Sequence, residues 1–247
     1  MEVGQSDKLH IGFIIQARMG SSRLPGKVLL PMPVQSNKTV LGRIVNELSQ
    51  SKFSGEIIVA TSTNPEDDAI EIFCQNFGIQ IYRGSVNDVL SRFVNIINLR
   101  QFDIVVRITA DNPLVDHLLL DELIDIHVNH RNDFTCSTGL PLGMNMEMVN
   151  PLVLQNLKTE ELSESDKEHV TISLKYNPSI RKEVVQMENS PTIGALRLTL
   201  DYPSDYVVLS AVLSVSDQTN IKGIIGVKTL FNKYPWLFQA NSNCIQK

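Results

Sequence analysis

Cysteine is scarce in this chain and is not arranged for the roles that cysteines commonly play. The three cysteines, Cys74, Cys136 and Cys244, lie far apart and show no C-x-x-C spacing. A disulfide framework or a zinc site normally needs clustered or regularly spaced cysteines. The sequence therefore indicates neither.

Positive charge and long apolar runs are also in short supply. The formal net charge is −5, whereas general nucleic-acid binders usually display a net basic surface. No apolar run approaches the length of about 20 residues that a membrane-spanning helix needs, and residues 1–10 are too polar for a secretory signal. We therefore expect a cytoplasmic protein that binds neither nucleic acid nor membrane.

Two common phosphate-binding patterns are missing as well. A P-loop has four residues between its first glycine and a Gly-Lys pair, followed by Ser or Thr. Here five residues separate Gly20 from Gly26-Lys27, and Val28 follows. The G-x-G-x-x-G fingerprint of dinucleotide-binding folds is also absent. A phosphate site in this chain would need another kind of loop.

Such a loop follows the first apolar run, which begins at Ile11. The segment from Ala17 to Lys27 holds three cations, two hydroxyl residues and two glycines, namely Arg18, Arg23, Lys27, Ser21, Ser22, Gly20 and Gly26. A triphosphate requires close backbone N–H groups, which glycine permits, and cationic side chains around them. We interpret the segment as a triphosphate-binding loop after a buried parallel strand. The alternative is a solvated polar loop, which three cations at one strand end make less favourable.

The rest of the first half alternates strands and helices. With 247 residues and 43% hydrophobic content, the chain is long enough for one α/β domain with a large core. The pattern predicts a Rossmann-like, mostly parallel sheet with helices on both faces. The expected later strands are 57–60, 79–82 and 104–108, and the expected helices are 39–49, 64–77, 87–100 and 117–129.

This alternation becomes irregular between residues 133 and 190. We expect strands at 134–138 and 181–187 and helical pieces at 151–157 and 164–176. We interpret residues 133–190 as a smaller α+β excursion that leaves the main sheet and returns by the strand at 181–187, with residues 143–148 forming a hairpin at a subunit boundary. The main sheet is expected to resume with a strand at 196–200, followed by helices at 201–215 and 221–231.

Two carboxylates follow expected strand ends. Asp111 comes after the strand at 104–108, and Asp201 comes after the strand at 196–200. Ligands of open α/β sheets bind outside the carboxyl ends of the strands, and magnesium is held by one or two carboxylates plus phosphate oxygens. The alternative is that each aspartate caps the next helix. Asp116 lies closer to the first of these helices and leaves Asp111 free, whereas capping by Asp201 stays open.

Several segments resemble one enzyme family. Ala17 to Leu29 reads Ala-Arg-Met-Gly-Ser-Ser-Arg-Leu-Pro-Gly-Lys-Val-Leu and resembles the opening motif of the sugar-acid cytidylyltransferases, most closely the spore-coat polysaccharide (SpsF-type) branch. Thr-Ala-Asp-Asn-Pro-Leu around Asp111 and Leu-Asp-Tyr-Pro-Ser-Asp around Asp201 resemble magnesium-binding segments of the ketodeoxyoctonate enzymes. The likeness extends over about residues 11–241.

The resemblance implies an activity. Members of this family transfer CMP from CTP to the anomeric hydroxyl of a sugar acid, release pyrophosphate and supply surface polysaccharide synthesis. It also implies Mg²⁺ as cofactor, a homodimer, and use of residues 133–190 for sugar binding and dimerisation. Thr109 stands where the ketodeoxyoctonate enzymes have glutamine, and Tyr202 stands where they have threonine. The identity of the sugar acid therefore stays open.

The resemblance also implies site residues. Arg18, Lys27 and Asp111 would be catalytic, and Asp111 and Asp201 would hold the metal. The nucleotide would be bound by Ala17, Arg18, Ser21, Arg23, Lys27, Thr61, Gly84 and Ser85. Glu147 and His169 are candidates for contacts to the sugar acid. The alternative is that Glu147 is an exposed acid of a hairpin and that His169 is a polar residue on the surface of a helix, without a role in binding.

Three other functions compete with this interpretation. A nucleotide-sugar-dependent glycosyltransferase usually carries an Asp-x-Asp metal motif, which no expected strand end shows. A sugar 1-phosphate nucleotidyltransferase normally opens with Gly-x-Gly-x-Arg, unlike Ala17 to Arg23. A nucleotide-sensing module would not need both carboxylates. The spacing of residues does not by itself select CTP over another nucleoside triphosphate.

Overall fold

A computed structural model describes residues 9–158, 161–188 and 190–245. Most of the amino-terminal stretch that was judged too polar for a secretory signal, residues 1–8, lies outside the described residues. The described part contains one seven-stranded sheet with the order β3-β2-β1-β4-β6-β5-β7. Its strands are β1 (Ile11–Gln16), β2 (Gly55–Ser62), β3 (Gln80–Gly84), β4 (Ile104–Thr109), β5 (Phe134–Thr138), β6 (Glu147–Val149) and β7 (Lys182–Gln186).

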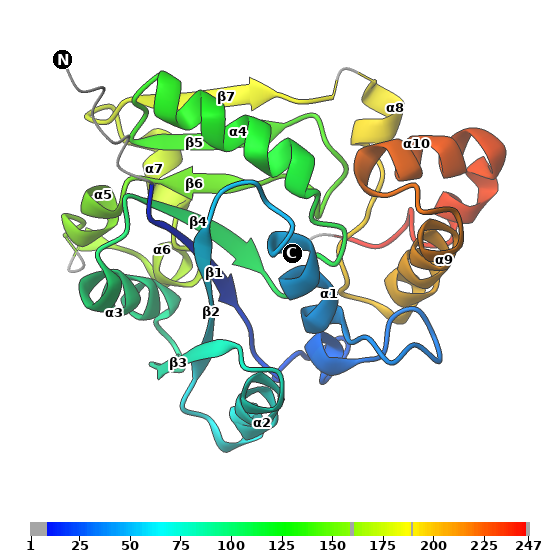
Figure 1. Ribbon diagram of the computed structural model, residues 1–247, viewed down its shortest axis with the longest axis horizontal. Coiled ribbons are helices and arrows are strands. Elements are labelled where there is room, and N and C mark those ends of the chain that lie inside the picture. The colour runs from blue at the N-terminus through cyan, green and yellow to red at the C-terminus, as the bar shows by residue number, and fades with distance from the viewer. Residues whose placement is uncertain (1–8, 159–160, 189, 246–247) are drawn as a thin grey trace, which may run out of the picture.

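Helices cover both faces of this sheet (Figure 1). The α-helices are α1 (Val40–Leu48), α2 (Asp68–Asn76), α3 (Val89–Arg100), α4 (His117–Asn129), α5 (Pro151–Gln155), α6 (Glu164–His169), α7 (Ile172–Tyr176), α8 (Pro191–Gly194), α9 (Pro203–Thr219) and α10 (Gly223–Lys233). Short 3-10 turns lie at Lys27–Leu29, Pro65–Asp67 and Pro235–Gln239. The expected fold class is confirmed. None of the described helices has the length and apolar character needed to cross a bilayer.

The parallel strand β1 lies at the centre of the fold. It pairs with β2 on one side and β4 on the other, so that Ile15 lies opposite Val59 and Ile108. Ile15 faces a core built with α1 and α4, and Ile14 faces a second core built with α3. Because both faces are covered, the strand is a near-continuous apolar run. The strand ends at Gln16, where the buried run stops, and the basic loop that follows therefore begins at the edge of the sheet.

The expectation that residues 133–190 leave the main sheet is wrong for β5 and β6, whereas the expected return by a strand at 181–187 is confirmed by β7. β6 pairs antiparallel with β4 and β5, and β7 pairs parallel with β5. Met144, Met146 and Met148 are at most 3% exposed, so they belong to the core and not to a subunit boundary. The alternation of the methionines with polar residues has the period of a strand with one buried face. Among the described residues of this segment, the helices α5, α6 and α7 lie outside the sheet.

Two further expectations also fail. Residues 196–200 form no strand but an extended segment with a single bridge between Arg197 and Leu142. The amide of Leu200 donates to the carbonyl of Asp111 over 2.8 Å, which still brings the segment to the predicted edge. The helix expected at 164–176 is two helices, because Val170 adopts φ 62° between α6 and α7. This value is rare for a β-branched residue.

Candidate active site

A polar cavity of about 520 Å³ opens at the carboxyl ends of β1 and β4. The loop after β1, the end of β4, the extended segment near residue 200, α3 and α6 all contribute to its wall. The loop closes on itself through a hydrogen bond from the Gly26 amide to the Met19 carbonyl at 3.0 Å. Gly26 has φ +70°, a conformation that favours glycine, and the chain then turns so that Lys27 faces inward.

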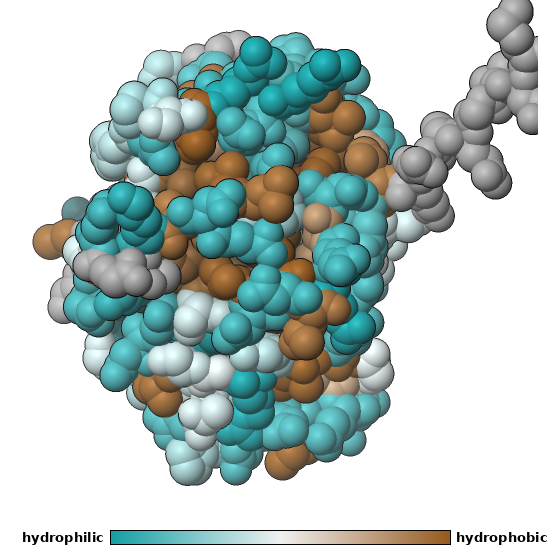
Figure 2. Space-filling view, turned by 90° about the vertical axis from the view of Figure 1, so that its left-hand side faces the viewer, coloured by the Kyte–Doolittle hydropathy of each residue, from teal (hydrophilic) through white to brown (hydrophobic). Residues whose placement is uncertain are grey.

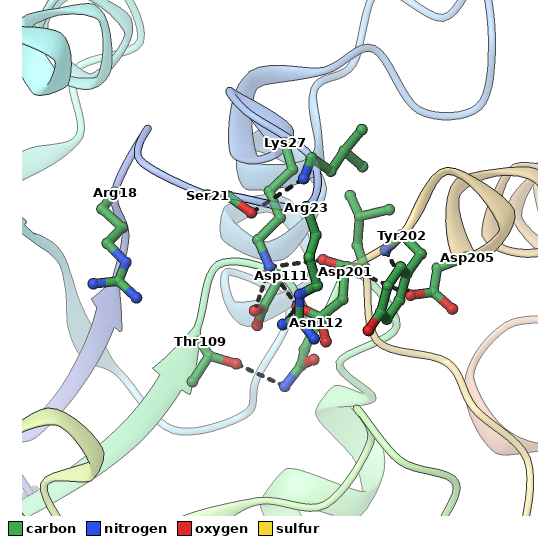
Figure 3. A network of polar contacts seen from close by, with 12 residues as sticks. Arg18, Ser21, Arg23, Lys27, Thr109, Asp111, Asn112, Asp201, Tyr202 and Asp205 are labelled. Carbon is green, nitrogen blue, oxygen red and sulfur yellow. Dashed lines mark hydrogen bonds and ion pairs between the residues drawn. The ribbon is translucent and has the colours of Figure 1, made fainter. Parts of the chain in front are cut away.

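Lys27 joins the three parts of this site (Figure 3). Its Nζ donates to Asp111 Oδ2 at 2.8 Å, to Asp201 Oδ1 at 2.9 Å and to the Leu200 carbonyl at 2.7 Å. These three bonds use all the hydrogens of a lysine ammonium. The sequence predicted that the basic loop and both aspartates meet at one edge, and the structure brings them together around one nitrogen atom.

Asp201 is surrounded by positive charge. Besides Lys27, Arg23 Nη2 donates to its Oδ1 at 2.7 Å and Arg197 Nη2 donates to its Oδ2 at 2.9 Å. Burial alone would raise the pKa of Asp201, but the hydrogen bonds and charges of Lys27, Arg23 and Arg197 outweigh it and hold the pKa below its ordinary value. Asp201 is therefore a carboxylate at neutral pH.

The hydrogen bonds at the starts of two helices show which aspartates cap a helix and which are available to the cavity. Asp205, in the first turn of α9, accepts the backbone N–H groups of Asp201 and Tyr202, each at 2.9 Å, so Asp201 itself does not cap that helix. Asp116 Oδ1 accepts the amides of Leu118 and Leu119 and caps α4. Asp111 is thereby free of a capping role and faces the cavity.

Arg18, Ala17 and Ser21 line the same cavity. Arg18 lies apart from the cluster around Lys27 (Figure 3) and pairs with Glu168 of α6 at 2.9 Å. Both partners are about half exposed, so the pair is of the kind that contributes at most about 1 kcal/mol. An incoming anion can therefore take over the Arg18 guanidinium at little cost. Ser21 Oγ accepts the Leu24 amide at 3.3 Å and helps to shape the loop.

His169 and Glu147 differ in their access to the cavity. His169, the last residue of α6, lines it, and the unusual backbone of Val170 separates it from Thr171. Glu147 lines a second cavity of about 290 Å³ that shares Arg107 with the first. The alternative of an exposed hairpin acid is wrong, because the Glu147 side chain is only 14% exposed.

The contacts of Glu147 occupy both of its oxygens. Oε2 accepts from Arg107 Nη1 at 2.9 Å and from Thr171 Oγ1 at 2.5 Å, and Oε1 lies 2.7 Å from Lys175 Nζ. Burial would raise the pKa of Glu147, but Arg107, Lys175 and Thr171 together lower it. Glu147 thus holds two cations at the wall of the second cavity and has little capacity left for a direct contact to a sugar.

Three residues of the expected nucleotide site, Thr61 in β2, Gly84 in β3 and Ser85, line neither of these two cavities. Thr61 is fully buried. The Gly84 carbonyl accepts the Thr63 amide at 2.9 Å, and Ser85 Oγ accepts the Asp88 amide at 3.2 Å. Their role in binding base and ribose stays a prediction.

Sequence reasoning missed two arginines of the cavity wall, Arg92 and Arg107. Both interrupt apolar patterns. Arg92 falls within the buried stripe of α3 that contains Val89, Phe93 and Ile96, and Arg107 stands inside the apolar run of β4. A cation within an apolar stripe was the available signal.

An open, mostly parallel sheet with a cation-rich cavity at its carboxyl edge defines a class of α/β proteins that bind phosphorylated ligands. The comparison with known families is more specific. The cytidylyltransferase family model matches residues 12–206, and the chain belongs to this family.

Individual relatives cover most or part of the chain. The spore coat polysaccharide biosynthesis protein SpsF of Bacillus subtilis is 34% identical over 90% of this chain and 94% of its own length. The 8-amino-3,8-dideoxy-manno-octulosonate cytidylyltransferase of Shewanella baltica is 28% identical over 58% of each chain. The solved structure of a cytidylyltransferase from Leptospira borgpetersenii has a TM-score of 0.83 at 28% identity and covers 96% of this chain and 98% of its own.

The charge cluster predicts how stability depends on pH in Asp201→Asn. The substitution leaves three cations without their shared carboxylate, so it should lower the free energy of unfolding by about 3–5 kcal/mol at neutral pH. Because the folded-state pKa of Asp201 lies below its ordinary value of 3.8, its contribution to stability is present above that pH and is lost as the pH falls through the folded-state pKa. Urea unfolding of wild type and variant should therefore show a constant difference from about pH 7 to pH 5 that narrows below 3.8. A difference that already closes between pH 7 and pH 5 would contradict the assignment.

Proposed function

We propose that the protein transfers CMP from CTP to the anomeric hydroxyl of a sugar acid and releases pyrophosphate, for the synthesis of a surface polysaccharide. The observation that carries the proposal is the meeting of Lys27, Asp111 and Asp201 in the cavity of a cytidylyltransferase family member. The relative from Bacillus subtilis is named for polysaccharide biosynthesis, and the one from Shewanella baltica for a sugar acid.

The reaction needs positioning and charge neutralisation more than covalent catalysis by the protein. The acceptor hydroxyl is the nucleophile, the α-phosphorus is attacked and pyrophosphate leaves. Arg18, Arg23 and Lys27 come from one loop and would neutralise the triphosphate and the leaving pyrophosphate. Asp201 holds both Arg23 and Lys27 at the cavity wall.

The residues present fit a magnesium ion. Asp111 Oδ2 and Asp201 Oδ1 both lie within 2.9 Å of one nitrogen, so the two carboxylates converge on one small cation. Their oxygens are ligands that Mg²⁺ prefers, together with phosphate oxygens and water. Bound there, the ion would polarise the phosphoryl oxygens as a Lewis acid. Asp111 and Asp201 would hold the ion, and the Lys27 ammonium, released from these two carboxylates, would pair with the phosphates.

The second cavity is suited to the acceptor. It adjoins the first, and its wall includes hydroxyl and amide side chains besides two cations, namely Thr109, Asn112, Ser137, Thr138, Asn145, Arg107 and Lys175. Alcohol and amide groups match the hydroxyls of a sugar, and the cations match an acid group. In this arrangement Glu147 positions Arg107 and Lys175, and His169 faces the nucleotide side of the junction.

We also propose that the enzyme works in the cytoplasm, where CTP is made, and as a homodimer. Figure 2 shows separate apolar patches on the side of the molecule that carries α3, α5 and α7 in Figure 1. On these helices Leu99, Leu152 and Tyr176 are between 62% and 81% exposed. A second copy would remove this apolar area from water. Light scattering coupled to gel filtration should give twice the chain mass of 27.6 kDa, and a monomer at all concentrations would refute the dimer.

The reaction is tested by pyrophosphate release. Purified protein incubated with each nucleoside triphosphate, Mg²⁺ and a panel of sugar acids should release pyrophosphate with CTP and one class of sugar acid. In Asp111→Asn and Asp201→Asn, kcat should fall by about 100-fold or more, because each variant loses a carboxylate that would hold the magnesium ion at the phosphoryl group. CTP should still bind weakly.

The matched control is Asp125→Asn, which alters an exposed carboxylate on α4 paired with Lys52. It should retain wild-type turnover. Full turnover in either site variant would remove the metal assignment, and absence of pyrophosphate release from wild type with every sugar acid would remove the proposed reaction.

A further inference from the structure

Arg92 differs from the other buried cations of this protein. Within the described part of the chain four cationic side chains are buried: Lys27, Arg43, Arg92 and Arg197. Lys27 pairs with Asp111 and Asp201, Arg43 with Asp217, and Arg197 with Asp201 and Asp205. Arg92 is the most buried, with 2% exposed, and no described carboxylate lies within 4.0 Å of it.

An unpaired buried charge is costly, so its presence calls for a reason. Two described acids, Asp67 and Asp88, raise the pKa of Arg92, but they do so through their charge at a distance and not through a direct contact. Asp67 is already used by the amides of Met19 and Ser62, and Asp88 caps α3 by accepting the Ser91 amide. Burial lowers the pKa of Arg92, and the nearby positive charge of Arg18 lowers it further. The site therefore favours an additional negative charge.

The geometry of Arg92 is fixed by the backbone. Its Nε donates to the Ser85 carbonyl at 2.7 Å, and its Nη2 donates to the Val86 carbonyl at 3.0 Å. Nη1 makes no hydrogen bond to any described residue, and Arg92 belongs to the wall of the main cavity, as does Arg18. The guanidinium is thus held rigidly with one nitrogen uncommitted beside a space that the substrates are proposed to enter.

We propose that Arg92 binds an anionic oxygen of a bound substrate, either a phosphate of the nucleotide or the carboxylate of the acceptor. The proposal rests on the proposed function, and it adds a binding residue on α3 to those of the loop after β1. Arginine is suited to this task because its charge is permanent and its planar donors match phosphate and carboxylate oxygens. Binding of the anion supplies the partner that the protein itself does not.

The competing explanation is structural: Arg92 would only hold the turn at Ser85 and Val86. The two roles can be distinguished by comparing the binding of ligands that differ in charge. A structural role affects uncharged and charged nucleosides alike, whereas an anion-binding role depends on the phosphate or carboxylate.

The experiment measures the binding of cytidine, CMP and CTP by calorimetry to wild type and to Arg92→Gln. Glutamine keeps a donor for the turn carbonyls and removes the charge. Affinity for CTP should fall about tenfold or more, as expected for a hydrogen bond to a charged group, while affinity for cytidine stays within about twofold. Arg92→Lys keeps the charge and should retain an intermediate affinity for CTP. Arg100→Met, an exposed arginine on the same helix, is the control and should bind all three ligands as wild type does.

The other possible results decide whether Arg92 binds the acceptor carboxylate or has only a structural role. If the three affinities are unchanged but the KM for ketodeoxyoctonate, used as the probe acid, rises about tenfold or more, the anion is the acceptor carboxylate. Equal losses for cytidine and CTP, or no change in any binding constant or KM, would overturn the proposal. If Arg92→Gln does not fold, the comparison of Arg92→Lys with wild type decides, since a structural role predicts equal losses for cytidine and CTP. CTP binding by wild type without pyrophosphate release would refute the proposed reaction and leave the Arg92 assignment testable.

Discussion

The interaction on which the site depends is the three-way hydrogen bonding of the Lys27 ammonium. It connects Lys27 with Asp111, 84 residues further along the chain, and with Asp201, 174 residues further along. Without the Lys27 ammonium, the carboxylates of Asp111 and Asp201 would be two like charges at the same sheet edge. The repulsion would be costly because Asp201 is buried. Arg23 and Arg197 complete the neutralisation of Asp201. The same charge balance that stabilises the fold thus keeps the Asp201 carboxylate ionised, and Asp111 and Asp201 both line the cavity.

The arrangement of the cavity follows from where the strands end. β1 and β4 are adjacent and parallel, so the basic loop and Asp111 must leave the sheet at the same edge. Asp201 reaches this edge through the hydrogen bond between Leu200 and the Asp111 carbonyl. The second cavity adjoins through Arg107 on β4, which belongs to both walls. Two adjoining cavities fit the proposed transfer between two substrates.

Local sequence patterns predicted much of this arrangement because the parallel half of the sheet is governed by local rules. Buried strands, helix caps such as Asp116 and the loop after β1 can be recognised from neighbouring residues. The errors arise where long-range pairing decides. Residues 196–200 look like a strand, but their partners are loop residues such as Leu142. The place of β6 between β4 and β5, and the break at Val170, depend on contacts that spacing cannot show. Arg92 lies in the apolar stripe of α3, and spacing alone does not show that its side chain reaches the cavity wall.

The most direct test of the central claim is a crystal structure with CTP and Mn²⁺, in which anomalous scattering locates the metal. The account predicts one Mn²⁺ bound by carboxylate oxygens of Asp111 and Asp201 and by phosphate oxygens, with Lys27 Nζ moved onto the triphosphate. A nucleotide bound elsewhere, or a metal that contacts neither aspartate while Lys27 still bridges them, would contradict it.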